Sequence, residues 1–183
     1  TEEHIELEEA VHRLLDASDY LTERVQRFTI DGNRIYMEQY FIEAFGSKRR
    51  EQSVSVLARD AKASEALDEL QQAMHHSVQL MDREYYAMRL VIEAKGIQDY
   101  PKVLRTVALR PEDAALAPEA KMRRATEMVL NADYYEQKSK IRAGIQKSVA
   151  ALEKLTHESE ETAMDNFLVD LNLGRLGIVL QIL

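Results

Sequence analysis

Apolar and small side chains recur over the first 30 residues at alternating steps of four and three. They are Leu7, Val11, Leu14, Ser18, Leu21, Val25 and Phe28. This spacing places them on one face of an α-helix, along a seam that packs lengthwise against another helix. The seam therefore predicts a fold in which long helices lie side by side.

The composition extends this prediction to the whole chain. Only 6 Gly and 3 Pro occur among 183 residues, while good helix formers are abundant. Such a composition favours helix almost throughout, and the length suits one domain with a substantial core. We therefore predict an all-α domain.

Turn signals separate the first three helices. The first is expected to stop within residues 29–33, where Gly32 permits a turn and Asp31 or Asn33 can cap the next helix. A second helix would run over about 34–60, and Ser64 would cap a third that ends at Gly96. The expected seam of the third helix is Leu67, Leu70, Met74, Val78, Met81, Tyr85, Met88 and Ile92.

Residues 97–132 contain all three prolines and are expected to form an elaborated connection, with short helical starts at Pro111 and Pro118. Asp133 and Glu136 then fit a capping box for a long last helix. Its expected seam is Ile141, Ile145, Ser148, Leu152, Leu155, Ser159 and Thr162. The prediction is an antiparallel four-helix bundle with a proline-containing connection between helices 3 and 4, which returns both termini to one end.

The last residues are unusually apolar. From Leu176 to Leu183 the only polar side chain is Gln181. A membrane span needs about 20 apolar residues, so this stretch is too short to be a complete one. We interpret residues 173–183 as the juxtamembrane start of a transmembrane helix that follows a domain of residues 1–172. The alternative is an amphipathic helix end packed in a dimer.

Charge and residue types exclude several functions. A formal net charge of −8 opposes binding to nucleic acid. The absence of cysteine excludes disulfides and thiolate chemistry and suits an oxidising exterior. The single E-x-x-H motif, Glu9 to His12, lacks the second copy that a di-iron bundle uses. We predict no catalytic residue, no metal and no cofactor, and hence no enzyme.

Antiparallel stacking would bring tyrosines and basic residues to one level, in the half of the bundle away from the termini. The guanidinium group of arginine binds carboxylates through two parallel hydrogen bonds, and the tyrosine side chain offers a flat apolar face and a hydroxyl. This level therefore suits a small anionic or aromatic ligand. The predicted ligand-binding residues are Arg24, Arg27, Tyr40, Tyr85, Arg89, Tyr135 and Lys138. The alternative is that these arginines only pair with local acids and that the tyrosine hydroxyls face water.

A second polar layer is expected nearer the termini. It comprises Ser18, Ser47, Ser77 and Ser148, close to Asp19, Arg49, Arg50, His75 and His76. It could bind ligand or loosen the packing so that helices slide. The alternative is that its small residues only permit close helix approach.

Three segments carry a resemblance to a known class. ASDYLTERVQRF (17–28), TIDGNRIY (29–36) and MDREYYAMRLV (81–91) resemble the extracytoplasmic four-helix sensor regions of Firmicutes transmembrane receptors. Such regions are similar in style to helical bimodular and CHASE-type sensors, and they precede chemotaxis, histidine kinase or diguanylate cyclase outputs. Many have a Thr-Gly-Asp turn before a tyrosine, from which residues 29–33 depart.

The resemblance implies a sensor domain on the extracytoplasmic side of the cell membrane. It implies a homodimer whose helices shift when a small molecule binds, without enzymatic activity of its own. Two other interpretations stay open: a coiled-coil dimerisation or scaffold module without a small-molecule ligand, and, ranked third, a metal- or haem-binding bundle.

Overall fold

Every regular element of the computed structural model, which describes residues 2–61 and 65–182, is a helix. The helices are α1 (Glu2–Asp31), α2 (Arg34–Phe41), η1 (Ile42–Ser47), α3 (Arg49–Ala61), α4 (Glu65–Lys95), α5 (Lys102–Arg105), α6 (Pro111–Ala114), α7 (Pro118–Leu130) and α8 (Ala132–Ile182). The all-α prediction is confirmed.

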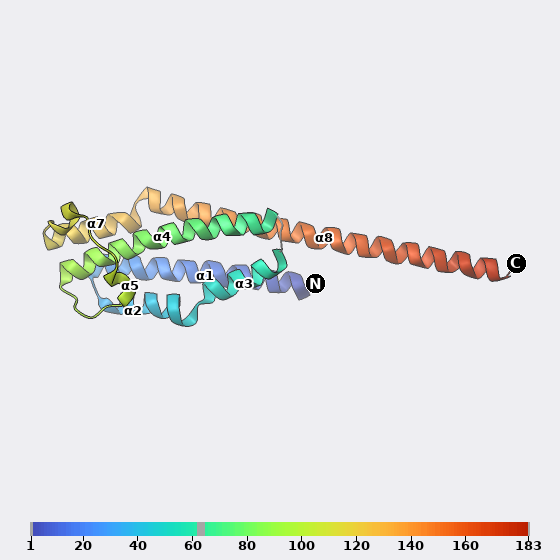
Figure 1. The fold of residues 1–183 in the computed structure, drawn as a ribbon, viewed down its shortest axis with the longest axis horizontal. Helices are drawn as coiled ribbons and strands as arrows, with labels where there is room; N and C mark the ends of the chain where they lie inside the picture. Colours follow the sequence, from blue (N-terminus) through green and yellow to red (C-terminus); the bar gives the residue numbers. More distant parts are fainter. Residues whose placement is uncertain (1, 62–64, 183) are drawn as a thin grey trace.

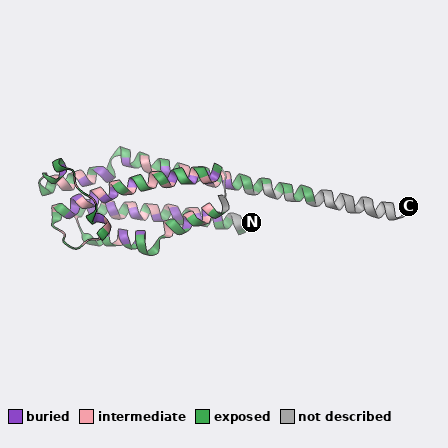
Figure 2. Cartoon of the chain, in the orientation of Figure 1, coloured by how far each residue is buried: buried purple, intermediate pink, exposed green. Residues whose placement is uncertain are grey.

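The long helices lie lengthwise, as Figure 1 shows. Helix α1 packs against α2 and α3 on one side, while α4 packs against α7 and α8. Buried side chains face inward between these helices (Figure 2). Helix α8 continues well past the other helices, and there its described side chains, such as Met164, are exposed.

The α1 seam is confirmed. Leu7, Leu14, Leu21, Val25 and Phe28 are buried, while the seam's other two members are half-buried. Burying one such leucine, valine or phenylalanine contributes about 1.5–3 kcal/mol. The seam is thus the part of the core that fixes how α1 packs.

Two glycines end long helices, as predicted. Gly32 has φ 70° and its N–H donates to the Phe28 carbonyl at 2.8 Å, after which the Asn33 side chain caps α2 by accepting from the Ile35 N–H at 3.1 Å. Gly96, with φ 65°, ends α4. Positive φ strains other L-residues, so glycine suits both positions.

The prediction of one helix over about 34–60 is wrong. The segment is broken by η1, a π-helical turn, which ends where the Lys48 N–H donates to the Glu43 carbonyl at 2.9 Å. Lys48 then adopts φ 48°, and α3 begins at the next residue. Gly46 lowers helix propensity here, and the buried Glu43 carboxylate accepts from Arg49 Nε at 2.9 Å, which holds the wider turn in place.

The predicted starts at Pro111 and Pro118 are confirmed, because both residues begin helices. The predicted capping box at the start of α8 is wrong. Asn131 supplies the cap, since its Oδ1 accepts from the Tyr134 N–H at 2.9 Å. Asp133 instead accepts from Arg83 Nη1 at 2.5 Å.

Three residues of the predicted seams are exposed. On α4, Val78 is 56% exposed; on α8, Leu155 is 44% exposed and Thr162 is exposed as well. Ser64 and Leu183 lie outside the described residues, as do the side chains of Ser159 and of 167–182. In the part of the chain that the structure describes, no helix is both long enough and apolar enough to cross a membrane.

Candidate functional site: a buried polar network

A carboxylate sits in the apolar core. Glu84 on α4 is 6% exposed, and its neighbours on the same helix face, Leu80 and Met88, are buried. Its Oε1 accepts from the Tyr40 hydroxyl at 3.2 Å, and its Oε2 accepts from the Tyr134 hydroxyl at 2.9 Å. These two bonds join α4 to α2 and to α8.

The network continues to α1 through the first turns of α8. The Tyr134 hydroxyl lies 3.3 Å from Thr22 Oγ1. Lys138 Nζ donates to the same Thr22 oxygen and to the Ser18 carbonyl at 3.3 Å, and it lies 3.6 Å from Asp19 Oδ1. Side chains from α1, α2, α4 and α8 thus meet in one connected polar cluster, which we call the Glu84 network: Ser18, Thr22, Tyr40, Glu84, Tyr134 and Lys138.

Burial opposes both charges of the Glu84 network. It raises the pKa of Glu84, against the opposing effects of the Tyr134 hydrogen bond and the Lys138 charge. It lowers the pKa of Lys138, against the effects of Asp19 and Glu84. Burial also raises the pKa of both tyrosines. The ionisation of this network therefore depends on how tightly the four helices exclude water.

The Glu84 network is suited to holding helices together. The cavities described for residues 2–61 and 65–182 do not have Tyr40, Glu84 or Tyr134 in their walls. A buried polar network of this kind fixes one helix arrangement when all its members are paired, and it penalises arrangements that break a pair. The Glu84 network therefore favours a role in stabilising one arrangement of the helices over others.

The structure brings together three of the seven residues predicted to bind ligand. Tyr40 and Lys138 belong to the Glu84 network. The Tyr85 ring packs against Tyr40, with centroids 6.4 Å apart, and against Phe41.

The other four predicted residues lie elsewhere and are occupied by local partners. Arg24 and Arg27 both pair with Glu23 and lie against the Tyr36 ring. Tyr135 is 47% exposed, and its hydroxyl accepts from Gln26.

Arg89 lies under the connection that follows α4. Its Nε donates to the Val107 carbonyl at 3.2 Å and its Nη2 donates to Glu93 at 2.7 Å. The predicted residues therefore do not converge on one cavity.

The second polar layer does not form as one level. Ser18 contacts Lys138, whereas Ser148, ten residues further along α8 and so about 15 Å away, donates to the Ala66 carbonyl at 2.7 Å. Ser77 accepts from Arg50, and Ser47 is exposed. Among the described side chains, no group of three or more His, Asp or Glu could hold a metal ion.

Glu84, Tyr134 and Thr22 were not among the predicted site residues, although Tyr134 belongs to the tyrosines expected at the level of the predicted ligand-binding site. A signal was present for two of them. Glu84 lies midway between Leu80 and Met88, and Tyr134 precedes Lys138 and Ile141 by four and seven residues, so both occupy the buried helix faces.

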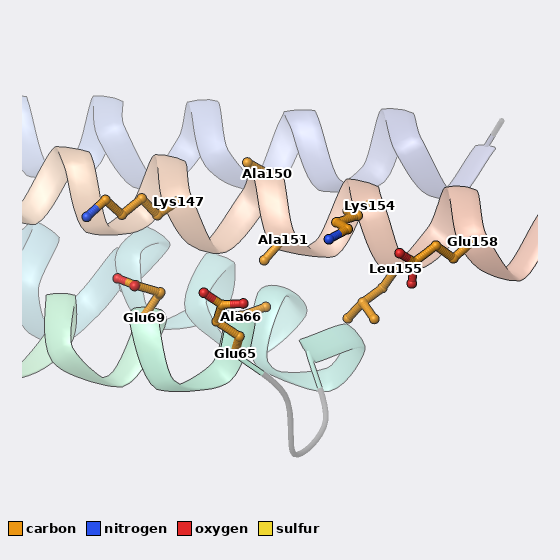
Figure 3. Close-up of a pocket in the computed structure, with 9 residues that line it drawn as sticks. All are labelled: Glu65, Ala66, Glu69, Lys147, Ala150, Ala151, Lys154, Leu155 and Glu158. Atoms are coloured by element: carbon orange, nitrogen blue, oxygen red, sulfur yellow. The ribbon is translucent and has the colours of Figure 1, made fainter.

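Two cavities lie at opposite ends of α4. A groove of about 510 Å³ runs between the start of α4 and α8, and Figure 3 shows Glu65 and Glu69 on one side with Lys147 and Lys154 on the other. A cavity of about 370 Å³ lies at the far end of α4, where Tyr100 and Arg105 contribute to its wall.

Comparisons with known protein families, with curated proteins and with solved structures found no significant match to this chain. The fold and the Glu84 network define an all-helical protein whose long helices are joined through a buried, ionisable cluster.

Proposed function

We propose that this chain is the extracytoplasmic ligand-sensing domain of a transmembrane signalling receptor, which transmits binding by displacing α8 and is not itself an enzyme. The course of α8 carries the proposal. This single helix of 51 residues is about 75 Å long; it begins inside the Glu84 network and extends beyond every other helix (Figure 1).

The start of α8 is linked to two other helices, which supports coupled movement. Tyr134 reaches Glu84 on α4, and Lys138 reaches Thr22 on α1. Any rearrangement of α1 against α4 must therefore stretch these bonds or move α8. Packed helices commonly respond by shifts of about 1–2 Å.

Close packing of α4 on α8 supports sliding as the form of that movement. A Cβ added at Gly144 would lie 3.1 Å from the Ala73 Cβ, so the two backbones approach closely there. Small residues at a contact leave little side-chain interlocking. We propose that this contact is where α8 moves along α4.

The finer architecture is part of the same proposal. We regard α1, the α2–η1–α3 segment, α4 and the α7–α8 segment as the four legs of an antiparallel bundle. The start of α1 and the projecting part of α8 lie at one end (Figure 1), which suits attachment to two membrane helices. On this view residues 173–183 begin the second membrane helix, and two chains form a homodimer.

The test is a thermal-unfolding screen of the chain against organic acids, amino acids and nucleobases. A compound at 100 times its Kd stabilises by about 2.7 kcal/mol, which raises Tm by about 5–10 °C in a domain of this size. We expect one chemical class to give a concentration-dependent rise. A flat profile across the panel would contradict direct sensing.

One observation favours a second function, a dimerisation or scaffold module without a small-molecule ligand. Such a module needs only self-paired side chains, and Arg24, Arg27 and Lys138 all lie within 4 Å of a carboxylate. A flat thermal profile together with a stable dimer would favour it.

A further inference from the structure

The cavity at the far end of α4 has an unusual wall. It measures about 370 Å³, within the size range of small-molecule sites, and lies between the last turn of α4 and the connection that leads into α5. The side chains that line it are Ile92, Glu93, Ile97, Gln98, Tyr100 and Arg105.

Two guanidinium groups lie over the Tyr100 ring. The Cζ of Arg89 is 5.1 Å from the ring centroid, and the Cζ of Arg105 is 5.7 Å from it. Such cation–π contacts hold a guanidinium group in place, and at Arg105 they leave N–H groups that can bind an anion. Tyr100 therefore positions two cations, of which Arg105 lines the cavity.

The charges at this cavity do not cancel. Arg89 is 12% exposed and pairs with Glu93, but its Nη1 is buried without a hydrogen-bond partner among the residues that the structure describes. No ion pair is described for Arg105 within residues 2–61 and 65–182. Around the Tyr100 ring, two arginines against one glutamate leave a single positive charge in excess.

We propose that this cavity binds a small organic monocarboxylate. The proposal rests on the sensor function proposed above and names its ligand class and site. Arg105 would bind the carboxylate. The Tyr100 ring and the two isoleucines would contact the apolar part of the molecule, and the ion pair of Glu93 with Arg89 would lie behind it. A bound anion balances the excess charge.

The position of the cavity explains how binding reaches the Glu84 network. Arg89 lies on α4 only five residues after Glu84, so both belong to one rigid helix. A ligand that draws Tyr100 and Arg105 toward the end of α4 would shift α4. Because Glu84 lies on the same helix, this shift would alter its contact with Tyr134.

Isothermal titration calorimetry of the 183-residue chain tests the proposal, with acetate, lactate and benzoate as probes and acetamide, lactamide and benzamide as matched neutral molecules. We expect at least one carboxylate to bind and its amide not to bind. Arg105→Gln should raise the Kd by about tenfold to about 100-fold, because a charged hydrogen bond is lost. Arg123→Gln, which removes an exposed arginine on α7, should leave the Kd unchanged, and circular dichroism should show the same helicity for both variants.

Three results would overturn the site: no carboxylate binds, the amides bind equally well, or the two arginine variants weaken binding equally. The proposed function fails separately. A disulfide between Ala73→Cys and Gly144→Cys would lock α4 to α8. Carboxylate binding that depends on Arg105 but not on this lock would uphold the site and contradict signalling through α8. A compound whose affinity depends on the disulfide lock but not on Arg105 would uphold signalling through α8 and contradict the proposed site.

Discussion

The Tyr134 hydroxyl lies 2.9 Å from Glu84 Oε2, and this contact joins the start of α8 to the middle of α4 inside the core. Tyr134 is fully buried and Glu84 is 6% exposed, so the bond forms where water does not compete. An unpaired group in such a place is costly. Tyr134 and Glu84 therefore constrain each other's helix.

The first prediction concerns stability against pH. Burial raises the pKa of Glu84 above its unfolded value of about 4.3, so between these two pKa values the folded chain binds a proton that the unfolded chain has released. The free energy of unfolding must then fall as pH rises through this window. Glu84→Gln should flatten this slope, measured by urea unfolding at pH values from about 4.5 upward.

The matched control is Glu136→Gln, which removes an exposed carboxylate near the start of α8 and should keep the wild-type slope. Lys138 acts with the opposite sign. Burial lowers its pKa below its unfolded value of about 10.4, so the free energy of unfolding rises with pH between these two pKa values. An unaltered slope in Glu84→Gln would show that Glu84 does not titrate abnormally.

The second prediction compares adjacent tyrosines. Tyr134→Phe removes a buried hydroxyl that binds Glu84, and it should lower the free energy of unfolding by about 1–3 kcal/mol. Tyr135→Phe alters a side chain that is 47% exposed, so the change should stay within about 0.5 kcal/mol. Urea unfolding of both variants measures the difference, and equal effects would argue against the Glu84 network as a structural link.

The third prediction concerns the turn after α1. Gly32→Ala places a side chain at φ 70°, with the added Cβ 2.5 Å from the Lys95 Cε, and should destabilise the chain by about 1–2 kcal/mol. At Gly46 a Cβ would meet nothing within 4 Å. Gly46→Ala should therefore leave stability unchanged or raise it by up to about 1 kcal/mol. A stable Gly32→Ala chain would mean that this turn relaxes freely.

The fourth prediction concerns the junction of α7 and α8. Arg83 on α4 donates to the Met128 carbonyl at 2.7 Å and to Asn131 at 3.0 Å, besides Asp133. This arginine lowers the pKa of Asp133. Arg83→Gln should raise that pKa toward its ordinary value of about 3.9, which carboxyl NMR titration can follow. A pKa that stays low would assign the effect to another group.

Much of the fold followed from local rules. The α1 seam predicted its buried face because one period of 3.6 residues applies over its whole length. The helix boundaries were predicted correctly at two glycines that follow helices, Gly32 and Gly96, and at two prolines that begin them, Pro111 and Pro118. Each of these residues restricts or permits a particular backbone conformation.

The break at η1 and the Glu84 network were not predictable in the same way. The run around Gly46 carries polar residues that a helix also tolerates, and the pairing of Glu43 with Arg49 six residues later does not follow any helical spacing. Glu84 was overlooked because charged residues are seldom fully buried unless paired. Its hydrogen-bond partners come from two other helices, so their convergence depends on the rotation of each helix about its axis. A shift of one residue exchanges Tyr134 for Tyr135.

The most direct test of the account asks whether a ligand distinguishes two positions of α8. The chain has no native cysteine, so Ala73→Cys/Gly144→Cys forms one defined disulfide across a close contact of α4 and α8. The Kd of the compound found by thermal screening is measured by calorimetry before and after reduction. We predict that the Kd changes by about fivefold or more, as is typical of coupled sites. Equal Kd values would contradict it, because a ligand with no preference between helix positions cannot move α8.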